Sequence, residues 1–292
     1  MKKKKYRIKR GFIQLAAAVF LNGYVIGYQK GMIFTGKSKL FCVPVLNCYS
    51  CPGALGACPI GSLQSVLSGY QHRIPFYVLG ILLLFGIFLG RVVCGFLCPF
   101  GWFQDLLHKI PVKKIPIPEK LDKVLRYLKY AVLAFPVLLL PFLIRDEFGF
   151  GTTWFCKYIC PAGTLGAGIP LIALNESLRQ AIGALFDWKI MVLMIIVLLS
   201  LTVYRPFCKY LCPLGAFYGV FNRFSFYRLT VDRSQCTDCK ACERACRMGV
   251  EVTRNINSPE CIRCGECLNA CPGKCIYREP LFPRKEAGNV SE

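Results

Sequence analysis

Four apolar runs without charged residues divide the chain before its soluble end. They cover residues 11–29, 74–90, 130–144 and 190–204. Runs of this kind are typical of helices that cross a bilayer. The second run is short, because its 17 residues reach only about 26 Å at ~1.5 Å per residue, against a hydrocarbon core of ~30 Å. The pattern predicts an α-helical membrane protein with about four transmembrane helices.

The charges between these runs predict their orientation. The chain carries 37 Lys and Arg against 16 Asp and Glu, a net charge of +21. Residues 1–10 and 91–129 are strongly basic, whereas residues 145–189 carry four charges of each sign. Because cytoplasmic loops are enriched in Lys and Arg, we expect both termini in the cytoplasm and residues 30–73 and 145–189 outside. We interpret residues 11–29 as an uncleaved helix rather than a signal peptide, because no clear cleavage site follows.

The segments form two similar membrane halves and a soluble end. Each half reads as an outward span, an outer cysteine loop, an inward span and an inner cysteine motif, which indicates duplication within one fold. Pro136 and Pro141 interrupt the third span, and residues 162–175 are expected to form a re-entrant or interfacial half-helix. The predicted segments are a basic N-terminus (1–10), a first membrane half (11–110), a Pro-rich basic linker (111–126), a second membrane half (127–228), an α+β domain (229–280) and a tail (281–292).

Composition narrows the class of protein. Hydrophobic residues make up 54% of the chain, which is too apolar for an ordinary soluble protein. Nucleic-acid binding is not indicated, because no basic and aromatic recognition module accompanies the positive charge. The chain has 19 cysteines, and their C-x2-C and C-x3-C spacings favour metal ligation over a secreted disulfide scaffold.

A short cysteine motif, Cys-x3-Cys-Pro-x-Gly, recurs near the ends of the apolar runs. It occurs in full at residues 94–101, 156–163 and 208–215, and a copy at 58–61 has Ala54 in place of the first cysteine. Cysteines at i and i+4 lie on one helix face, so one motif can offer two thiolates to one metal centre. The proline suits the first turn of a new helix, where its missing N–H is not needed.

Two longer cysteine runs between residues 229 and 280 carry the most specific signal. Both have the spacing C-x2-C-x2-C-x3-C of bacterial ferredoxins, in which the fourth cysteine of each run ligates the other [4Fe-4S] cluster. Zinc ribbons, the alternative, use two C-x2-C pairs. The prediction is that cluster one is held by Cys236, Cys239, Cys242 and Cys271, and cluster two by Cys261, Cys264, Cys267 and Cys246.

The membrane part has enough cysteines for one or two more clusters, because a cubane needs four thiolates. An inner cluster is expected at Cys94, Cys98, Cys208 and Cys212. An outer cluster would use Cys58, Cys156 and Cys160, with Cys51 as the fourth ligand or Cys48 as the alternative. The outer cysteines could instead form disulfides, and the inner ones could be packing cysteines without metal. Cys42 and Cys275 are left without a ligand role.

Other cofactors are not indicated. The two histidines, His72 and His108, do not form the facing pair that a b-type haem needs. No Gly-rich dinucleotide or phosphate loop occurs. Asp105, Glu147 and Asp187 lie near the expected membrane edges, where they could assist proton transfer from a quinol or remain solvated boundary charges. We therefore expect iron–sulfur clusters, with no haem and no flavin in this chain.

The combination of spans that end in Cys-x3-Cys-Pro with a C-terminal double ferredoxin resembles the NapH/MauN-type membrane polyferredoxins, which are related to the membrane portions of the NosR and CcoG families. The resemblance covers about residues 10–280, and its motifs fall on the inner cysteines and the eight ferredoxin cysteines. It implies a membrane iron–sulfur protein that passes electrons between a quinol or cytoplasmic donor and a redox partner. This chain lacks the flavin-bearing domain of the NosR type and adds outer cysteines.

Three functions fit these motifs. The first is a membrane relay that passes electrons between a cytoplasmic or quinol donor and an extracytoplasmic flavoprotein or cytochrome, as a subunit rather than a stand-alone enzyme. The second is a NapH-like quinol-oxidising subunit whose clusters all serve the cytoplasmic face. The third is a CcoG-like assembly factor for metalloenzymes. In each case we expect a multi-pass protein of a bacterial or archaeal cytoplasmic membrane.

Overall fold

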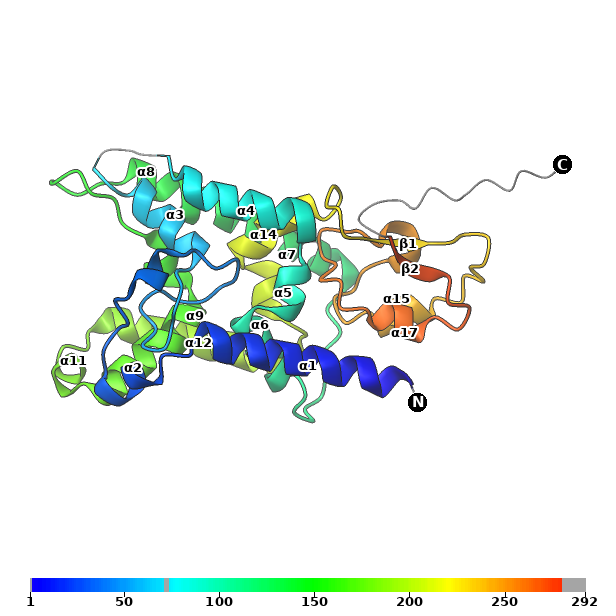
Figure 1. The fold of residues 1–292 in the computed structure, drawn as a ribbon, viewed down its shortest axis with the longest axis horizontal. Helices are drawn as coiled ribbons and strands as arrows, with labels where there is room; N and C mark the ends of the chain where they lie inside the picture. The colour runs from blue at the N-terminus through cyan, green and yellow to red at the C-terminus, as the bar shows by residue number, and fades with distance from the viewer. Residues whose placement is uncertain (1, 71–73, 280–292) are drawn as a thin grey trace.

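The chain forms an elongated molecule, with a helical body and a smaller C-terminal α+β part at one end of its long axis (Figure 1). The computed structural model describes residues 2–70 and 74–279, with side chains from residue 10 onward. The first half of the body consists of α1 (Lys2–Leu21), α2 (Val25–Lys30), the 3-10 helix η1 (Lys37–Leu40), α3 (Pro59–Leu67), α4 (Phe76–Leu89), α5 (Val92–Phe96) and α6 (Pro99–Leu107).

The prediction of the first span is wrong for residues 22–29. The sequence predicts one helix through residues 11–29, but α1 ends at Leu21 and α2 begins only at Val25. Asn22 donates from its side chain to the carbonyl of Ala18 at 3.0 Å, and Gly23 follows. A side-chain amide that bonds the backbone, followed by glycine, is a helix-ending combination that apolarity alone does not reveal.

The second half of the body repeats the order of the first. It consists of α7 (Glu119–Val132), the π-helical segment η2 (Leu133–Leu139), α8 (Leu140–Leu143), the π-helical segments η3 (Phe155–Ile159) and η4 (Thr164–Gly168), α9 (Pro161–Gly163), α10 (Ile169–Leu174), α11 (Glu176–Gln180), α12 (Ala184–Thr202), α13 (Pro206–Tyr210) and α14 (Pro213–Phe221).

The prolines of the third predicted span widen its helix without breaking it. The helix runs without a gap from Glu119 to Leu143, eleven residues before the predicted start. The π-helical segment η2 contains Pro136, which cannot donate a backbone hydrogen bond. Gln64 donates from Nε2 to the carbonyl of Pro136 at 2.6 Å. A side chain from the other half therefore satisfies a carbonyl at the irregular turn.

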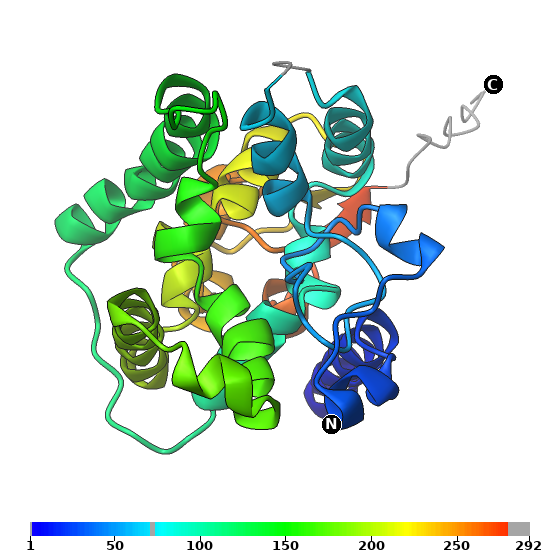
Figure 2. The ribbon, with the colours of Figure 1, turned by 90° about the vertical axis from the view of Figure 1, so that its left-hand side faces the viewer.

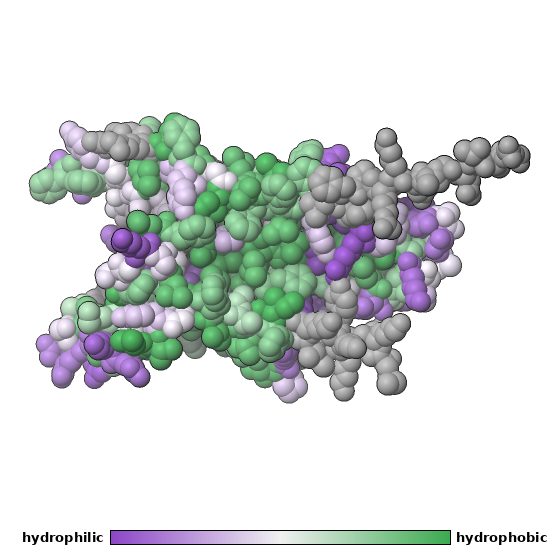
Figure 3. Space-filling model, viewed as in Figure 1, coloured by the Kyte–Doolittle hydropathy of each residue, from purple (hydrophilic) through white to green (hydrophobic). Residues whose placement is uncertain are grey.

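Two described helices, Glu119–Leu143 and Ala184–Thr202, are long and apolar enough to cross a membrane. Only 22% and 17% of their apolar windows are buried, so they face outward, unlike the core helices of a soluble protein. The other two predicted spans coincide with shorter apolar helices, Arg10–Leu21 and Phe76–Leu89. Figure 2 shows α1, α4, α7 and α12 around the outside of the body, and Figure 3 shows apolar side chains across its middle.

The core of the body lies on the long axis, between these outer helices. Its fully buried side chains include Val93, Phe155, Phe207 and Tyr218, each with 0% exposure. They come from α5, η3, α13 and α14, which belong to both halves of the chain. The short helices that carry the cysteine motifs therefore form the centre of the molecule.

The C-terminal part contains a two-stranded antiparallel sheet and three short helices. Strand β1 (Arg228–Val231) pairs with β2 (Ile276–Glu279), with Arg228 opposite Glu279 and Val231 opposite Ile276. Between the strands lie α15 (Ala241–Ala245), α16 (Val252–Asn255) and α17 (Glu266–Ala270). A separate buried cluster supports these elements; it includes Leu229, Met248, Val250 and Ile262.

Buried polar side chains join the C-terminal part to the body. The Asn222 side chain accepts from the backbone N–H of Arg91 at 2.9 Å and donates to the carbonyl of Cys261 at 2.7 Å. Arg263 donates to the carbonyls of Leu89 at 3.1 Å and Asn222 at 2.6 Å. These contacts fix the ferredoxin-like loops against the end of α4.

One contact between the two parts requires a glycine. A Cβ at Gly95 would lie 2.4 Å from the carbonyl oxygen of Ile262. We expect Gly95→Ala to lower the free energy of unfolding by about 1–3 kcal/mol, because backbone must move to admit the methyl group. Thermal unfolding in detergent measures this. Gly80→Ala is the matched control, because Gly80 lies in α4 with nothing within 4 Å of the added Cβ. Equal stability of the two variants would contradict the prediction.

Candidate iron–sulfur sites

Each Cys-Pro step in the body marks the start of a helix. Cys58, Cys98, Cys160 and Cys212 are the N-caps of α3, α6, α9 and α14, and the following proline takes the first helical position. The prediction that this proline begins a new helix is confirmed. In α6 and α14 the backbone N–H three residues later donates to the cysteine Sγ at 3.4 Å. Such donors, at the positive end of a helix, favour the thiolate that ligates metal.

The two inner motifs meet at the centre of the body. All their cysteines are buried, with exposures of 5–7%. The Cys212 thiol lies close enough to Cys208, Cys94 and Cys98 to interact with them electrostatically. The Gln104 side chain donates to Cys208 Sγ at 3.0 Å. The structure thus brings together the four predicted inner ligands, called here the inner group.

Two arginines join the inner motifs, and the sequence prediction missed them. Arg91 precedes Cys94 by three residues and donates to the carbonyl of Cys208 at 3.0 Å. Arg205 precedes Cys208 by three residues and donates to the carbonyl of Cys94 at 2.8 Å. Both arginines are 0% exposed. The signal was present in the sequence, because both inner motifs read Arg-x2-Cys-x3-Cys-Pro-x-Gly, whereas the outer motif has Thr153 at the arginine position.

The glycine of each inner motif leaves room for the arginine of the other. A Cβ at Gly101 would lie 3.2 Å from Arg205 Nη1, and a Cβ at Gly215 would lie 3.1 Å from Arg91 Nη2. Contacts of 3.0–3.4 Å are tighter than most real Cβ contacts. The Cys-Pro-x-Gly phrase therefore provides a thiolate, a helix start and space for a guanidinium group from the other half of the chain.

Each arginine belongs to a buried triad of two cations and one carboxylate. In the Arg205 triad, Asp105 binds Arg205 at 2.6 Å and Arg10 at 2.7 Å. In the Arg91 triad, Glu260 binds Arg91 at 3.1 Å and also pairs with Lys129. Because Glu260 comes from the C-terminal part and Lys129 from α7, the second triad joins three regions of the chain.

Both carboxylates are held in their charged form. Burial raises the pKa of Asp105, but Arg205 and Arg10 outweigh this effect and lower its pKa to about 2. Burial likewise raises the pKa of Glu260, but the charges of Arg91 and Lys129 outweigh it, so the pKa of Glu260 lies below its ordinary value. Opposite charges at hydrogen-bond distance favour the ionised form.

The outer cysteines form a second group, whose fourth member is Cys48. The Cys156 thiol lies close enough to Cys160, Cys58 and Cys48 to interact with them electrostatically. Cys51, the first choice from the sequence, instead contacts the Tyr28 hydroxyl at 3.1 Å. The sequence could not separate the two candidates, because both border the segment after Cys160: a Cβ at Gly163 would lie 3.5 Å from Cys48 Sγ, and a Cβ at Gly166 would lie 3.8 Å from Cys51 Sγ. Cys48, Cys58, Cys156 and Cys160 are called here the outer group.

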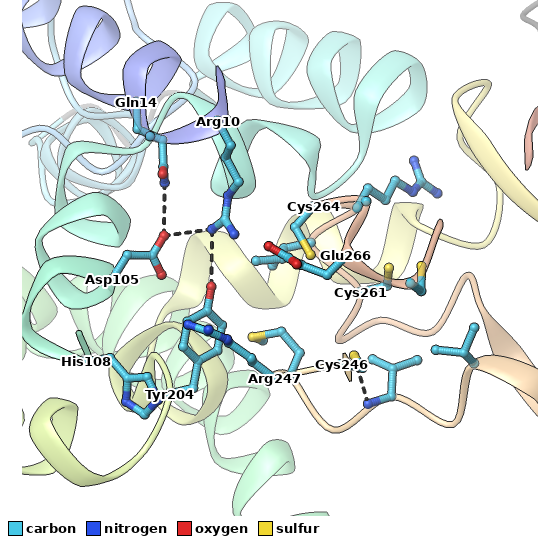
Figure 4. A pocket seen from close by; sticks show the side chains of 18 of the residues that line it. Arg10, Gln14, Asp105, His108, Tyr204, Cys246, Arg247, Cys261, Cys264 and Glu266 are labelled. Atoms are coloured by element: carbon cyan, nitrogen blue, oxygen red, sulfur yellow. Dashed lines mark hydrogen bonds and ion pairs between the residues drawn. The ribbon is translucent and has the colours of Figure 1, made fainter. Parts of the chain in front are cut away.

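The predicted ligands of cluster two line one side of a large cavity. The Cys267 thiol has Cys261, Cys264 and Cys246 as charged neighbours. All four line a cavity of about 850 Å³, whose other side is formed by α1 and α6 (Figure 4). Burial raises the pKa of Cys261 to about 12, so its thiolate needs a positive partner such as iron.

The predicted ligands of cluster one lie at the far end of the C-terminal part. Cys236, Cys239, Cys242 and Cys271 line one small pocket together with Cys275. Cys239 is the one exposed cysteine in the chain, and backbone and hydroxyl donors lower its pKa. Cys275 Sγ lies 3.3 Å from Cys271 Sγ, so the cysteine left without a ligand role is beside this group. A cluster here would have an edge open to solvent.

The donor sets fit iron–sulfur clusters. All 19 cysteines lie in the described part of the chain and are free thiols. Within that part, no three His, Cys, Asp or Glu side chains are arranged to hold a single metal ion. Four thiols around one space are what a cubane requires. Arg91 Nε, buried without a hydrogen-bond partner among the described residues, leaves a donor available to a sulfide.

These features define a membrane iron–sulfur protein, and comparison with known proteins agrees. The 4Fe-4S binding domain family matches residues 74–118, 131–171 and 184–228. The 4Fe-4S dicluster domain family matches residues 228–272. The first set of matches covers the three complete motifs at residues 94–101, 156–163 and 208–215, and the last covers both ferredoxin runs.

The relatives identify the family. The methylamine utilization ferredoxin-type protein MauN of Paracoccus denitrificans is 31% identical over 251 residues, which are 83% of this chain and 76% of MauN. An uncharacterised protein of Methanocaldococcus jannaschii is 32% identical over 213 residues, 70% of this chain and 79% of that protein. The ferredoxin-type protein NapH of Haemophilus influenzae is 27% identical over 210 residues, 66% of this chain and 64% of NapH. No solved structure gives a significant match. The chain belongs to the NapH/MauN-type family of 4Fe-4S ferredoxin-type proteins.

The outer group gives a test of ligand choice. With all four groups loaded, the chain would hold about 16 iron atoms, four per cubane. We expect Cys48→Ser to lose about four of them, because Cys48 is in the outer group. Iron analysis of the purified chain measures this. Cys51→Ser is the matched control and should keep its iron, because Cys51 lies outside the group. Iron loss in the control but not in Cys48→Ser would reverse the assignment.

Proposed function

We propose that this protein relays electrons across a membrane through [4Fe-4S] clusters, between a cytoplasmic donor and an extracytoplasmic redox partner. The observation that carries the proposal is the placement of four cysteine groups along one molecule. The C-terminal part holds two at one end, and the inner and outer groups follow within the body. When bound, the clusters would supply one-electron transfer and no bond-making chemistry.

Sixteen cysteines would hold the clusters in this proposal. The ligand sets are Cys236, Cys239, Cys242 and Cys271; Cys246, Cys261, Cys264 and Cys267; Cys94, Cys98, Cys208 and Cys212; and Cys48, Cys58, Cys156 and Cys160. The exposed Cys239 marks the end where a soluble donor would dock. The membrane topology that we propose has four spans and both termini in the cytoplasm, in accord with the charges of the loops.

The fold addresses the distance problem of a transmembrane relay. Clusters at opposite surfaces of a ~30 Å hydrocarbon core would couple poorly. In this structure the inner and outer motifs begin short helices inside the body, and six of their eight cysteines belong to or pack against one buried core: Cys58, Cys94, Cys98, Cys156, Cys160 and Cys212. Gly95, between two inner ligands, touches the backbone of Ile262, next to the cluster-two ligand Cys261. Consecutive groups are thus brought close by backbone packing.

Electron transfer across a bilayer tests the relay directly. We expect proteoliposomes with trapped ferricyanide to oxidise external dithionite at least tenfold faster than empty vesicles, and Cys156→Ser to abolish the gain, because it removes an outer ligand. Absorbance of trapped ferricyanide measures the rate. Cys42→Ala is the matched control, since Cys42 is buried but outside all four groups. A Cys156→Ser rate equal to that of the unmodified chain would refute the transmembrane path.

A second candidate function, quinol oxidation at the inner face, is favoured by the cavity beside cluster two. Polar side chains from α1 and α6 line its side away from the cysteines: Arg10, Gln14, Asp105 and His108, with Tyr204 between them (Figure 4). The Tyr204 hydroxyl accepts from Arg10 at 3.2 Å, and His108 Nδ1 is buried without a partner among the described residues. Such polar groups can orient a quinol head group, and His108, whose Nδ1 has no partner among the described residues, can accept a proton from it.

Filling the cavity tests this second function. A Cβ at Gly11, which lines the cavity, has nothing within 4 Å, so a large side chain can enter it from α1. We expect Gly11→Trp to slow reduction of the ferredoxin clusters by a water-soluble quinol at least tenfold and to leave their reduction by dithionite unchanged. Gly11→Ala is the control. Cys156→Ser should retain quinol-dependent reduction. An unchanged rate in Gly11→Trp would remove the cavity from consideration.

A further inference from the structure

The inner group lies between the Arg91 triad and the Arg205 triad, and each triad carries an excess positive charge. Two cations share one carboxylate in both, so each triad has a net charge of +1. The side chains of Arg91, Lys129 and Arg205 are 0% exposed and that of Glu260 is 6% exposed, whereas those of Arg10 and Asp105 are 10% and 12% exposed and line the cavity beside cluster two. Each triad therefore places one more positive than negative charge beside the inner motifs, fully buried in the Arg91 triad and next to the cavity in the Arg205 triad.

Buried charge of this kind requires a counter-charge close by. An unpaired ion is strongly destabilising in a protein interior, where solvent cannot screen it. The inner thiols are the groups next to both guanidinium groups, because each arginine donates to the backbone carbonyl of a ligand in the opposite motif. A cubane with four thiolates has a net formal charge of about −2 when oxidised and about −3 after it accepts one electron. The two triads would balance the oxidised charge.

The triads are also independent of each other in the chain. Arg91 precedes the first inner motif and takes its carboxylate from the C-terminal part, whereas Arg205 precedes the second and takes its carboxylate from α6. The same charge pattern is thus built twice from different segments. The hydrogen bonds to the cysteine carbonyls require Arg91 and Arg205. They do not require Lys129 or Arg10, the second cation of each triad.

We propose that the two triads set the reduction potential of the inner cluster, by supplying two buried positive charges that stabilise its thiolate-bound, electron-rich state. The electron would come from cluster two, which is oxidised as the inner cluster is reduced. This inference rests on the proposed cluster at the inner group and adds a role for residues that ligate nothing. Arg91 and Arg205 are positioning residues, and Asp105 and Glu260 limit their charge.

The sign of the effect provides the test. An EPR-monitored redox titration of the full chain in detergent measures the inner cluster, assigned as the signal that Cys94→Ser removes. We expect Arg205→Gln to lower the ratio of reduced to oxidised cluster at least tenfold at a fixed potential, a shift of about 59 mV to lower potential for one electron. Asp105→Asn should shift it the opposite way, because it leaves two cations with no carboxylate.

Controls separate charge from damage to the fold. Arg205→Lys keeps the charge and should stay within threefold of the unmodified chain. Arg145→Gln removes one charge in the outer loop, where Arg145 binds the carbonyls of Phe142 and Gly149 and lies over the Phe142 ring, and should have no effect. If Arg205→Gln loses the cluster, Glu260→Gln, which should raise the potential, and Lys129→Gln, which should lower it, supply the same comparison at the other triad.

The outcomes separate the charge effect proposed here from the proposed inner cluster on which it rests. Shifts of opposite sign for the arginine and carboxylate variants support it. Shifts of the same sign, or of less than threefold, in a chain that retains the inner signal would overturn the charge mechanism and leave the cluster in place. Absence of any signal that depends on Cys94 would overturn the proposed inner cluster and this inference with it.

Discussion

The centre of this protein depends on two arginines that cross between its halves. A guanidinium group is stable in a core only when its donors and its charge are satisfied. Arg91 takes its partners from the second half and from the C-terminal part, so both must be folded around it. Arg205 takes a partner from the first half, so that half must be folded as well. Burial of these charges therefore makes the three parts of the chain depend on each other.

The same constraint explains why each cysteine group is assembled from distant segments. A cubane needs four thiolates around one space, and one Cys-x3-Cys turn provides two. Two turns must meet with their helix starts directed at the same space, and small residues must let their backbones approach. Gly101 and Gly215 leave room for the guanidinium group of the opposite motif, and Gly95 lets the backbone of the C-terminal part approach at Ile262. The close succession of groups along the molecule is a result of this backbone packing.

Sequence reasoning recovered elements whose signal is local. The apolar runs, the helix starts after each Cys-Pro and the family were predictable, because hydrophobic length, proline stereochemistry and cysteine spacing act over a few residues. It misjudged the end of α1 at Leu21 and the continuous helix through Pro136, because a side-chain amide and a π-helical turn decide those points. It also missed Arg91 and Arg205, although both inner motifs carry an arginine three residues before the first cysteine, Cys94 or Cys208.

What the sequence alone determined is which groups can ligate metal, how they are spaced and which ends of the helices are basic. What only the tertiary structure decided is which groups share a space: Cys48 with the outer cysteines, Cys51 with Tyr28, and each buried arginine with the opposite motif. The physical reason is that ligation and charge compensation act between residues more than a hundred positions apart, as between Arg91 and Cys208 or Glu260, through contacts that no local pattern encodes.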